Sequence, residues 1–511
     1  MNPAAIAGAV LLARARAREH ADMIVLVGGL GLTLLVSLLI AQRWSAALAG
    51  GLVLALAGAL LYVGRPGLFI CASLLPFALL DEATPDAVPS LDRIAGELYS
   101  DRANGYLAPR DLLLALGVFA AANWFPPAER RAARTFGRVT WVMIAAGGMI
   151  AACLVVGYYV LDRPAASVVA LRPFYTCVAA AYIVWRLLRW MTAERAERAV
   201  FTASLVTGGL IIALGAARVA GLAGTAVDID GVPITFYDAT TPFLLLACVG
   251  VWAAWIAGRR VEGRARLALG AAVLAGVLVA IASQRRAVLL GYLAAALVLL
   301  VVNAVRKRGG VRRSLKITFA VLAVTAVALL LVSAVVPGAR ELLVERAQSA
   351  LQAGEQRSSA DSSLQFRVQE SDAVYALAGR HLWDGIGPGV GFTPVNGIFM
   401  PLDGSYIHNT YFALPLRYGL WGILALTVLV VGLTLRVIRG VYRDPPMMAW
   451  SLGAAPIAML PAIATAAFLT QTVRWPIVLG VLIGAFDALS EPDLEPMPDL
   501  AAARAAAVAR A

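Results

Sequence analysis

The sequence predicts an all-α polytopic membrane protein with about 14 transmembrane helices and one large structured loop. Of its 511 residues, 60% are hydrophobic and only 14% are charged, and the mean hydropathy is +0.79. A soluble core cannot hide that much apolar surface, and many runs reach the roughly 20 residues that cross a bilayer. Basic residues gather in alternate short connections, a bias that accounts for the net charge of +12 without a nucleic-acid partner.

The apolar runs place about eleven spans in residues 23–336 and about three in residues 408–489. The N-terminus, 1–22, has arginines before a long first run, which predicts an uncleaved signal anchor. A short polar tail, 490–511, ends the chain. The expected spans lie at about 23–41, 44–63, 66–80, 111–125, 139–161, 166–187, 199–217, 241–257, 266–282, 287–304, 317–336, 408–437 (interrupted by Pro415), 448–469 and 473–489.

The arginines and lysines predict the orientation of these spans. With the N-terminus in the cytoplasm, most of the 43 basic residues and every strongly basic short connection fall on the cytoplasmic side. Both termini are then cytoplasmic, and residues 337–407 form a periplasmic loop. Ser362 and Gln365 in this loop fit a capping box that opens a helix to about Arg380, and 340–352 has similar helical spacing.

Five arginines stand where the positive-inside bias does not explain them. A charge at membrane depth usually faces a cavity or a partner, and the planar guanidinium fork is suited to phosphate or pyrophosphate. The alternative is that each arginine extends toward lipid headgroups at the membrane surface. This alternative is weakest for the adjacent pair in a four-residue turn. These arginines are Arg172, Arg218, Arg285, Arg286 and Arg417.

A glycine-rich segment leads from the loop to a histidine at the start of a span. Gly385, Gly387 and Gly389 cannot hold a regular helix, so the backbone there must turn or pass close to something. His408 and Asn409 follow. A neutral imidazole can accept a proton from an attacking hydroxyl, and the asparagine can orient the ring or cap the helix. The alternative for His408 is a hydrogen-bonded residue with no chemical role.

Metal chemistry has weak support in the sequence. The four cysteines all fall inside apolar runs and read as small core residues, with no disulfide framework or zinc spacing. Asp228 and Asp230 form a lone Asp-x-Asp motif, which resembles that of metal-dependent glycosyltransferases but is more often a solvated turn. We expect no metal and no other cofactor.

Several of these segments together resemble one family, the O-antigen ligase/polymerase family. The resemblance covers about 200–440, and the His-Asn segment after the large loop is its most specific part. The segments that carry it are Arg218-Val-Ala-Gly221, Ser283-Gln284-Arg285-Arg286-Ala287, Gly385-Ile-Gly-Pro-Gly389, His408-Asn409-Thr410-Tyr411 and Tyr418-Gly419-Leu420-Trp421-Gly422.

The resemblance implies a GT-C-like glycosyltransferase that takes its glycan from an undecaprenyl-diphosphate donor at the periplasmic face of the bacterial inner membrane. It implies catalytic roles for His408, Arg286 and Arg218, and pyrophosphate binding by Arg218, Arg285, Arg286 and Arg172. Asn409, Gly387, Gly389 and Arg417 would support the site. The family often has serine where this chain has Arg285, so either member of the pair remains a candidate for the second essential arginine.

The expected function is an O-antigen or exopolysaccharide polymerase, with an O-antigen ligase that attaches the glycan to lipid A-core as the alternative. The expected partners are the lipid-linked oligosaccharide, an acceptor glycan or lipid A-core, the bilayer and, for a polymerase, a chain-length regulator. A lipid-linked sugar transporter is the rival from another class. It predicts an internal repeat and ionisable residues near mid-bilayer, whereas the exceptional residues here crowd one face.

Overall fold

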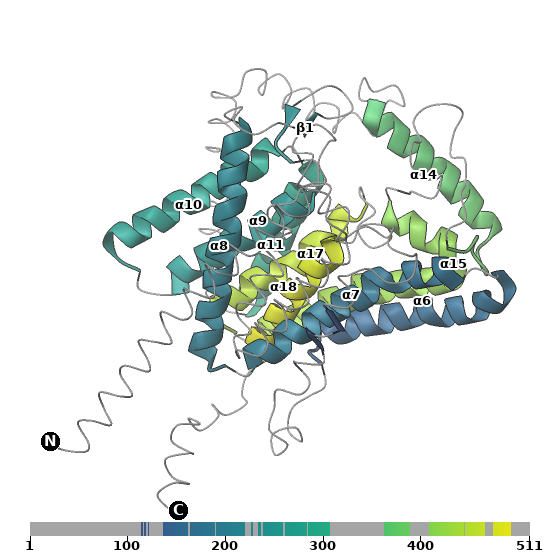
Figure 1. Cartoon of the computed structure of the whole chain (residues 1–511), viewed down its shortest axis with the longest axis horizontal. Coiled ribbons are helices and arrows are strands. Elements are labelled where there is room, and N and C mark those ends of the chain that lie inside the picture. Colours follow the sequence, from purple (N-terminus) through teal and green to yellow (C-terminus); the bar gives the residue numbers. More distant parts are fainter. Residues whose placement is uncertain are drawn as a thin grey trace, which may run out of the picture.

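The computed structural model describes a bundle of helices that begins at residue 136, together with five positions between 114 and 121 (Figure 1). The expected spans at 23–41, 44–63, 66–80 and 317–336, most of the span at 111–125, and the stretch 340–352 lie outside the described residues. The described ranges are 136–161, 164–189, 191–219, 226–227, 233–236, 239–258, 261–283, 285–306, 362–388, 407, 409–443, 445–464 and 474–491.

The described elements confirm an α-helical fold and fall within a few residues of the expected spans. The helices are α6 (Thr140–Leu161), α7 (Pro164–Arg189), α8 (Ala193–Val219), α9 (Thr240–Gly258), α10 (Gly263–Ala282), α11 (Arg286–Arg306), α14 (Ser362–Arg380), α15 (Thr410–Thr427), α16 (Leu433–Tyr442), α17 (Met447–Ala462) and α18 (Arg474–Ser490). A π-helical turn, η1 (Val428–Gly432), joins α15 to α16, and two short strands, β1 (Ala226–Val227) and β2 (Pro233–Ile234), pair antiparallel.

Five apolar stretches of the described chain are long enough to cross a membrane. They are Ala193–Arg218, Thr240–Gly258, Gly263–Ala282, Ala287–Val305 and Thr410–Tyr442. Shorter apolar segments within α6, α17 and α18 pack among them. The chain is therefore a multi-pass membrane protein, while the total of about 14 spans remains a prediction.

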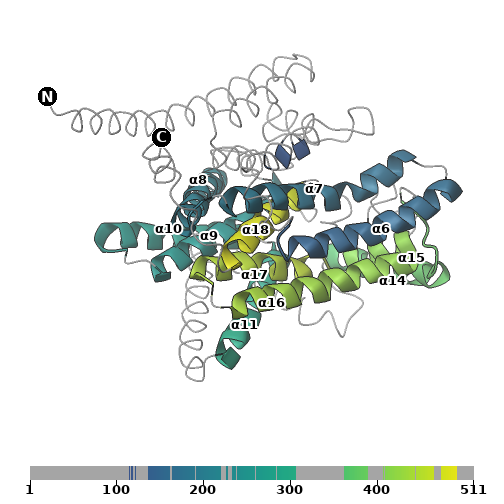
Figure 2. The ribbon, with the colours of Figure 1, turned by 90° about the horizontal axis from the view of Figure 1, so that it is seen from below.

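The helices form two groups that meet at α17 and α18. In both views α8, α9 and α10 lie on one side and α6, α14 and α15 on the other (Figures 1 and 2). The most extensive interfaces are those of α18 with α7 and of α11 with α17. Helix α9 is the most deeply buried of the five spans, since 61% of its apolar window lies inside the protein.

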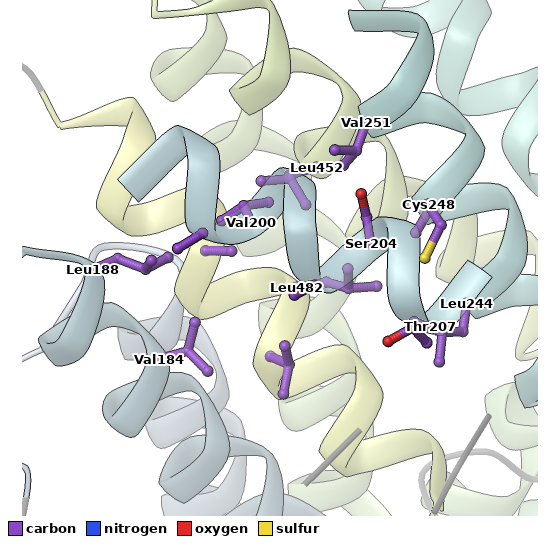
Figure 3. A pocket seen from close by; sticks show the side chains of 15 residues that line it. Val184, Leu188, Val200, Ser204, Thr207, Leu244, Cys248, Val251, Leu452 and Leu482 are labelled. Atoms are coloured by element: carbon purple, nitrogen blue, oxygen red, sulfur yellow. The ribbon is translucent and has the colours of Figure 1, made fainter. Parts of the chain in front are cut away.

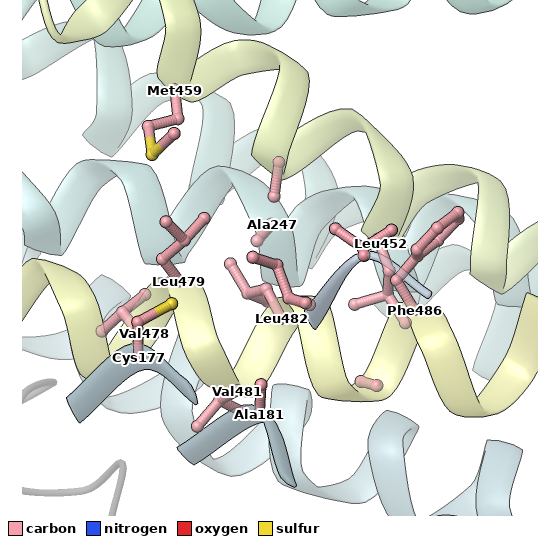
Figure 4. Close-up of a cluster of buried hydrophobic side chains, with 14 of the residues drawn as sticks. Cys177, Ala181, Ala247, Leu452, Met459, Val478, Leu479, Val481, Leu482 and Phe486 are labelled. Carbon is pink, nitrogen blue, oxygen red and sulfur yellow. The ribbon is translucent and has the colours of Figure 1, made fainter. Parts of the chain in front are cut away.

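Small residues explain the close contact between α7 and α18. A Cβ added at Gly480 would overlap the carbonyl of Cys177, and one added at Gly484 would overlap the carbonyl of Ala181. Gly480 and Gly484 form the Gly-x-x-x-Gly spacing that lets membrane helices approach backbone to backbone. Leucine and valine side chains of α18 close the rest of this core (Figure 4). The expected role of the cysteines as core residues is confirmed for Cys177 and Cys248, both of which are buried.

Helix α6 is held at its start by a carboxylate from α18. Asp487 is 1% exposed and accepts hydrogen bonds from the backbone N–H groups of Val139 (2.9 Å) and Thr140 (3.0 Å). The Thr140 hydroxyl donates a further bond to it at 2.9 Å. The first N–H groups of a helix have no partner within the helix, so Asp487 acts as a cap supplied from a distant element.

The long helix expected from 408 to about 437 is broken at Gly419, not at Pro415. Pro415 lies inside α15, whereas Gly419 has φ 53° and ψ −132°. Proline removes the hydrogen bond that its N–H would donate and can bend a helix, while a left-handed φ turns the chain out of the helical path. Glycine is the residue that adopts such a φ without strain, which is why the break occurs there.

Candidate functional site

Two of the predicted arginines meet on one short segment at an end of the bundle. Arg218 Nη1 donates a hydrogen bond of 2.7 Å to the carbonyl of Thr235, and its Cζ lies 5.3 Å from the ring centroid of Phe236. Arg285 Nε donates to the carbonyl of Phe236 at 3.4 Å. The Thr235 hydroxyl donates to the carbonyl of Ala282 at 3.1 Å. We call these five residues the arginine junction.

The junction forms because three elements end at the same level. Arg218 lies in the last turn of α8, β2 leads directly into Thr235 and Phe236, and α10 ends at Ala282. The ring of Phe236 reaches this level because Gly215 of α8 has no side chain. A Cβ there would overlap Val279 of α10 and lie 3.3 Å from the Phe236 ring. Phe236 is fully buried, and Arg218 is only 7% exposed.

The arginine pair also marks the start of α11. The carbonyl of Arg285 accepts hydrogen bonds from the N–H groups of Val288 (3.1 Å) and Leu289 (3.3 Å), so Arg286 is the first helical residue. The start of a helix carries a partial positive charge and unsatisfied N–H donors, which favour anions. The side chain of Arg286 lies outside the described residues, so its role remains a prediction.

The arrangement of α9, α11 and α17 follows from three contacts. The hydroxyl of Tyr292, early in α11, donates to the carbonyl of Phe243, early in α9, at 3.1 Å. The last residue of α9, Gly258, lies beside Met447, the first of α17: a Cβ added to it would lie 4.0 Å from that of Met447. Gly250 of α9 likewise faces Ser451 of α17, so contacts run in opposite order along the two helices and α17 is antiparallel to α9, while the early part of α11 lies beside the early part of α9.

This arrangement brings the start of α15 to the same end as the arginine pair. A Cβ on Gly291 of α11 would overlap the carbonyl of Ala458 of α17. About 7–8 Å along each helix from this contact, α11 begins at Arg286 and α17 ends beside Ile463. The carbonyl of Ile463 accepts a hydrogen bond of 2.9 Å from the backbone N–H of Thr410, the first residue of α15.

The residues that flank His408 are both fixed in place. Asn409 caps α15, since its side chain accepts a hydrogen bond of 3.0 Å from the N–H of Tyr411. The Tyr411 hydroxyl in turn donates to the carbonyl of Leu460 at 2.8 Å. On the other side, Ile407 is 1% exposed. The capping role expected for Asn409 is confirmed, whereas His408 itself lies outside the described residues.

The glycine-rich segment docks on the break in α15. The N–H groups of Ile386 and Gly387 donate to the carbonyls of Leu416 (2.8 Å) and Arg417 (3.0 Å). In an unbroken helix these carbonyls would accept from residues 420 and 421, but the turn at Gly419 removes those partners. The loop therefore supplies the donors that the broken helix lacks.

Glycine is required on both sides of this contact. Gly385 has φ 66°, and a Cβ on it would overlap the carbonyl of Arg417. A Cβ on Gly419 would lie 2.7 Å from the carbonyl of Trp383. The prediction that the glycine segment turns and passes close to another part of the chain is confirmed for Gly385 and Gly387, and Gly389 lies outside the described residues.

The other two predicted arginines lie on α7 and α15. Arg172 of α7 is 3% exposed and donates from Nε to the Tyr175 hydroxyl at 3.1 Å. Arg417 of α15 is 7% exposed. Helix α7 packs mainly on α18 and α6, and α15 packs mainly on α6 and α14. The contacts of the arginine junction thus unite Arg218 with Arg285, and Arg172 and Arg417 lie on other elements.

A buried carboxylate on α14 escaped the sequence analysis. Glu370 is 1% exposed and lies one turn before Val374, on the face that packs with Ile407 at the start of α15. Val374 belongs to one buried cluster with Ala413 and Leu416, so the face of α14 that carries Glu370 covers the first turns of α15. The rings of Tyr375 and Phe412 lie 6.2 Å apart beside it. The sequence did offer one signal: Glu370 lies at the helical spacing of the apolar residues of this helix, on the face expected to be buried.

A separate apolar cavity lies deeper in the bundle. It has a volume of about 60 Å³ and lies among α7, α8, α9, α17 and α18 (Figure 3). The polar groups in its lining are few, and one of them, Ser204, accepts a hydrogen bond of 3.0 Å from Trp252 Nε1. Ser204 precedes Arg218 by about 21 Å along α8, so this cavity is distinct from the arginine junction.

The described residues contain no group of three or more histidine, cysteine or acidic side chains that could hold a metal ion. Asp228 and Asp230 lie outside them. The arrangement that the structure does place at this end of the bundle is cationic: two arginines joined through Phe236, beside the start of a long helix. Such a constellation is suited to a phosphate-containing anion.

The family model described as O-antigen ligase matches residues 270–427. The match takes in Arg285, Arg286, the glycine segment, His408 and all of α15, and it leaves Arg218 and Arg172 outside. No curated protein matches the chain.

Proposed function

Since its match at residues 270–427 places the chain in the O-antigen ligase/polymerase family, we propose that it is a GT-C-type glycosyltransferase of the bacterial inner membrane, acting as an O-antigen or exopolysaccharide polymerase. It takes a glycan from an undecaprenyl-diphosphate donor and transfers it to a sugar hydroxyl at the periplasmic face. The five apolar helices that are long enough to cross a membrane support this proposal, because a lipid-linked donor would reach the site from within the bilayer.

The transfer forms one bond and breaks one. The acceptor hydroxyl oxygen attacks the anomeric carbon of the donor's first sugar, and the bond from that carbon to the phosphate oxygen breaks. Undecaprenyl diphosphate leaves with the bonding electron pair, and the hydroxyl proton passes to His408. Imidazole is suited to this step because its ordinary pKa lies near neutrality.

The arginines carry the charge of the leaving group. Arg218, with Arg285 and Arg286, binds the diphosphate and stabilises the negative charge that grows as the glycosidic bond breaks. The start of α11 adds a fixed positive potential at the same place. In this proposal Arg172 contributes to donor binding from α7, and Arg417, Asn409, Gly387 and Gly389 keep the start of α15 and its loop in position.

One observation carries the proposal: segments far apart in the sequence converge at one end of the bundle. The arginine junction unites Arg218 with the turn before α11, and the end of α17 holds the start of α15 at the same level. Arg218 lies outside the family match, yet it contacts the same residue as Arg285 inside it. The proposed transfer needs the donor diphosphate and the proton acceptor at one site, and that convergence supports such a site.

The test is a reconstituted transfer assay with a lipid-linked oligosaccharide donor. Arg218→Ala should lower the rate by about 10²–10³-fold, because one group that meets the leaving-group charge is lost. Activity should survive EDTA, since arginines take the place of a divalent cation. A wild-type rate for Arg218→Ala would refute the arginine role. Loss of activity in EDTA that Mg²⁺ or Mn²⁺ restores would instead indicate a metal site at Asp228 and Asp230.

The second candidate is an O-antigen ligase, because the matched family model bears that description. Both reactions use the same donor and differ in the acceptor, which is a growing glycan for a polymerase and lipid A-core for a ligase. A deletion strain that makes short glycans attached to lipid A-core indicates a polymerase. A strain that makes long glycans without that attachment indicates a ligase.

A further inference from the structure

Phe236 occupies an unusual position between the two arginines. Its ring lies 5.3 Å from the guanidinium carbon of Arg218, and its backbone carbonyl accepts a hydrogen bond from Nε of Arg285. One residue therefore contacts α8 through its side chain and the turn before α11 through its backbone. Phe236 lies outside the family match at 270–427.

We propose that Phe236 is a positioning residue that holds Arg218 and Arg285 together as one diphosphate-binding clamp. This inference rests on the proposed function, because the clamp is the part of the site that takes the donor diphosphate. Phe236 does not touch the reacting atoms. It acts through the two arginines, whose orientation it sets.

The chemistry of the ring explains why phenylalanine is suited to this position. Arg218 is nearly buried, and a buried guanidinium needs favourable partners in place of water. The face of an aromatic ring carries partial negative charge and attracts a cation without a competing formal charge. A carboxylate in the same place would neutralise the arginine and repel the diphosphate. The ring holds the guanidinium in place and leaves its positive charge available to the diphosphate.

The segment that carries Phe236 is itself tied down. The Thr235 carbonyl accepts from Arg218, and the Thr235 hydroxyl donates to Ala282 at the end of α10. The absence of a side chain at Gly215 gives the ring its room against α8. Helices α8 and α10 thus constrain this segment and its ring, so a change in the ring's shape or electrostatics should be transmitted to Arg218.

The experiment compares Phe236→Leu with a matched control, Phe243→Leu. Both phenylalanines are fully buried, but Phe243 packs on Trp475 and Tyr292. Inorganic pyrophosphate is the probe, measured as an inhibitor of transfer by the full-length protein. Phe236→Leu should weaken pyrophosphate inhibition about 5- to 30-fold and raise KM for the donor more than it lowers kcat. Phe243→Leu should lower thermal stability and leave pyrophosphate inhibition unchanged.

A second series separates the ring's charge distribution from its packing. Replacing Phe236 with 4-fluoro-, difluoro- and trifluorophenylalanine keeps the shape and progressively weakens the negative face of the ring. Pyrophosphate inhibition should weaken step by step along this series, and the same series at Phe243 should have no effect. This holds even where Phe236→Leu fails to fold.

The outcomes distinguish this inference from the proposed function. If Arg218→Ala relieves pyrophosphate inhibition but the fluorinated series at Phe236 leaves it at the wild-type value, the clamp inference is wrong and the proposed function stands. If neither Arg218→Ala nor the Phe236 series changes the inhibition, or if pyrophosphate does not inhibit the wild-type protein, both are wrong.

Discussion

At the scale of single residues, the end of the bundle is organised by cations whose neighbours fix their direction. Arg218 is held by a carbonyl and a ring, and Arg285 by a carbonyl and by its place before α11. A guanidinium offers a rigid fork of donors, so fixing its plane fixes the direction in which it meets an anion. The roles of the arginines therefore depend on geometry as well as charge.

Lysine substitution tests this dependence. We expect Arg286→Lys to abolish transfer as completely as Arg286→Ala, because lysine keeps the charge and loses the paired donors. Arg285→Lys should retain part of the activity, since we propose Arg286 as the second essential arginine. Transfer rates and donor KM of the purified variants measure this. An active Arg286→Lys beside an inactive Arg285→Lys would reverse the assignment of the pair.

The sequence predicted roles that depend on neighbouring residues in the chain, and it did not predict roles that depend on contacts between distant segments. Asn409 was identifiable as a cap because the group that it caps lies two residues away. Phe236 carries no such signal, because its partners are Arg218 and Arg285, which only the folded chain brings to it. Glu370 had a weak signal in its phase with the apolar face of α14, and its burial depends on how α14 packs against α15.

At the scale of elements, α15 and the glycine segment form one unit. The helix breaks at Gly419, and the loop donates hydrogen bonds to the carbonyls just before the break. The apolar runs predicted the positions of the helices because run length and composition decide what crosses a bilayer. The site of the break was not predicted, since Pro415 is the stronger sequence signal and the docking partner lies in another segment.

Replacing the glycines at this contact should loosen the start of α15. Gly419→Ala places a side chain at φ 53° and 2.7 Å from the Trp383 carbonyl, which should cost about 1–3 kcal/mol of stability and lower transfer. Gly379→Ala is the matched control, since a Cβ there meets nothing within 4 Å and should be neutral or stabilising by about 0.5–1 kcal/mol. Thermal unfolding in detergent measures both. Equal stability of the two variants would contradict the account.

At the scale of the whole molecule, the account depends on one orientation in the membrane. The described helices bring the arginine junction and the start of α15 to one end of the bundle, and the distribution of basic residues predicts that this end is periplasmic. The location of α14 on the same side follows from its packing on α15.

Single cysteines test the orientation directly. In a protein whose native cysteines are replaced, Tyr375→Cys should react with an impermeant thiol reagent in intact cells, because Tyr375 is 70% exposed on α14. Arg443→Cys, in the exposed turn after α16, should react only after the cells are opened. Reaction in intact cells of Arg443→Cys, or of a single cysteine placed at 307–313, would overturn the topology.

The central claim is that His408 accepts the proton of the attacking hydroxyl at the end of the bundle where the arginines hold the diphosphate. Its most direct test is the transfer rate of His408→Ala in a reconstituted assay, together with donor binding by the same protein. We expect the rate to fall by about 10²–10⁴-fold with donor binding nearly unchanged, because a base acts on the chemical step and the arginines bind the donor. Transfer at the wild-type rate by folded His408→Ala would contradict the mechanism.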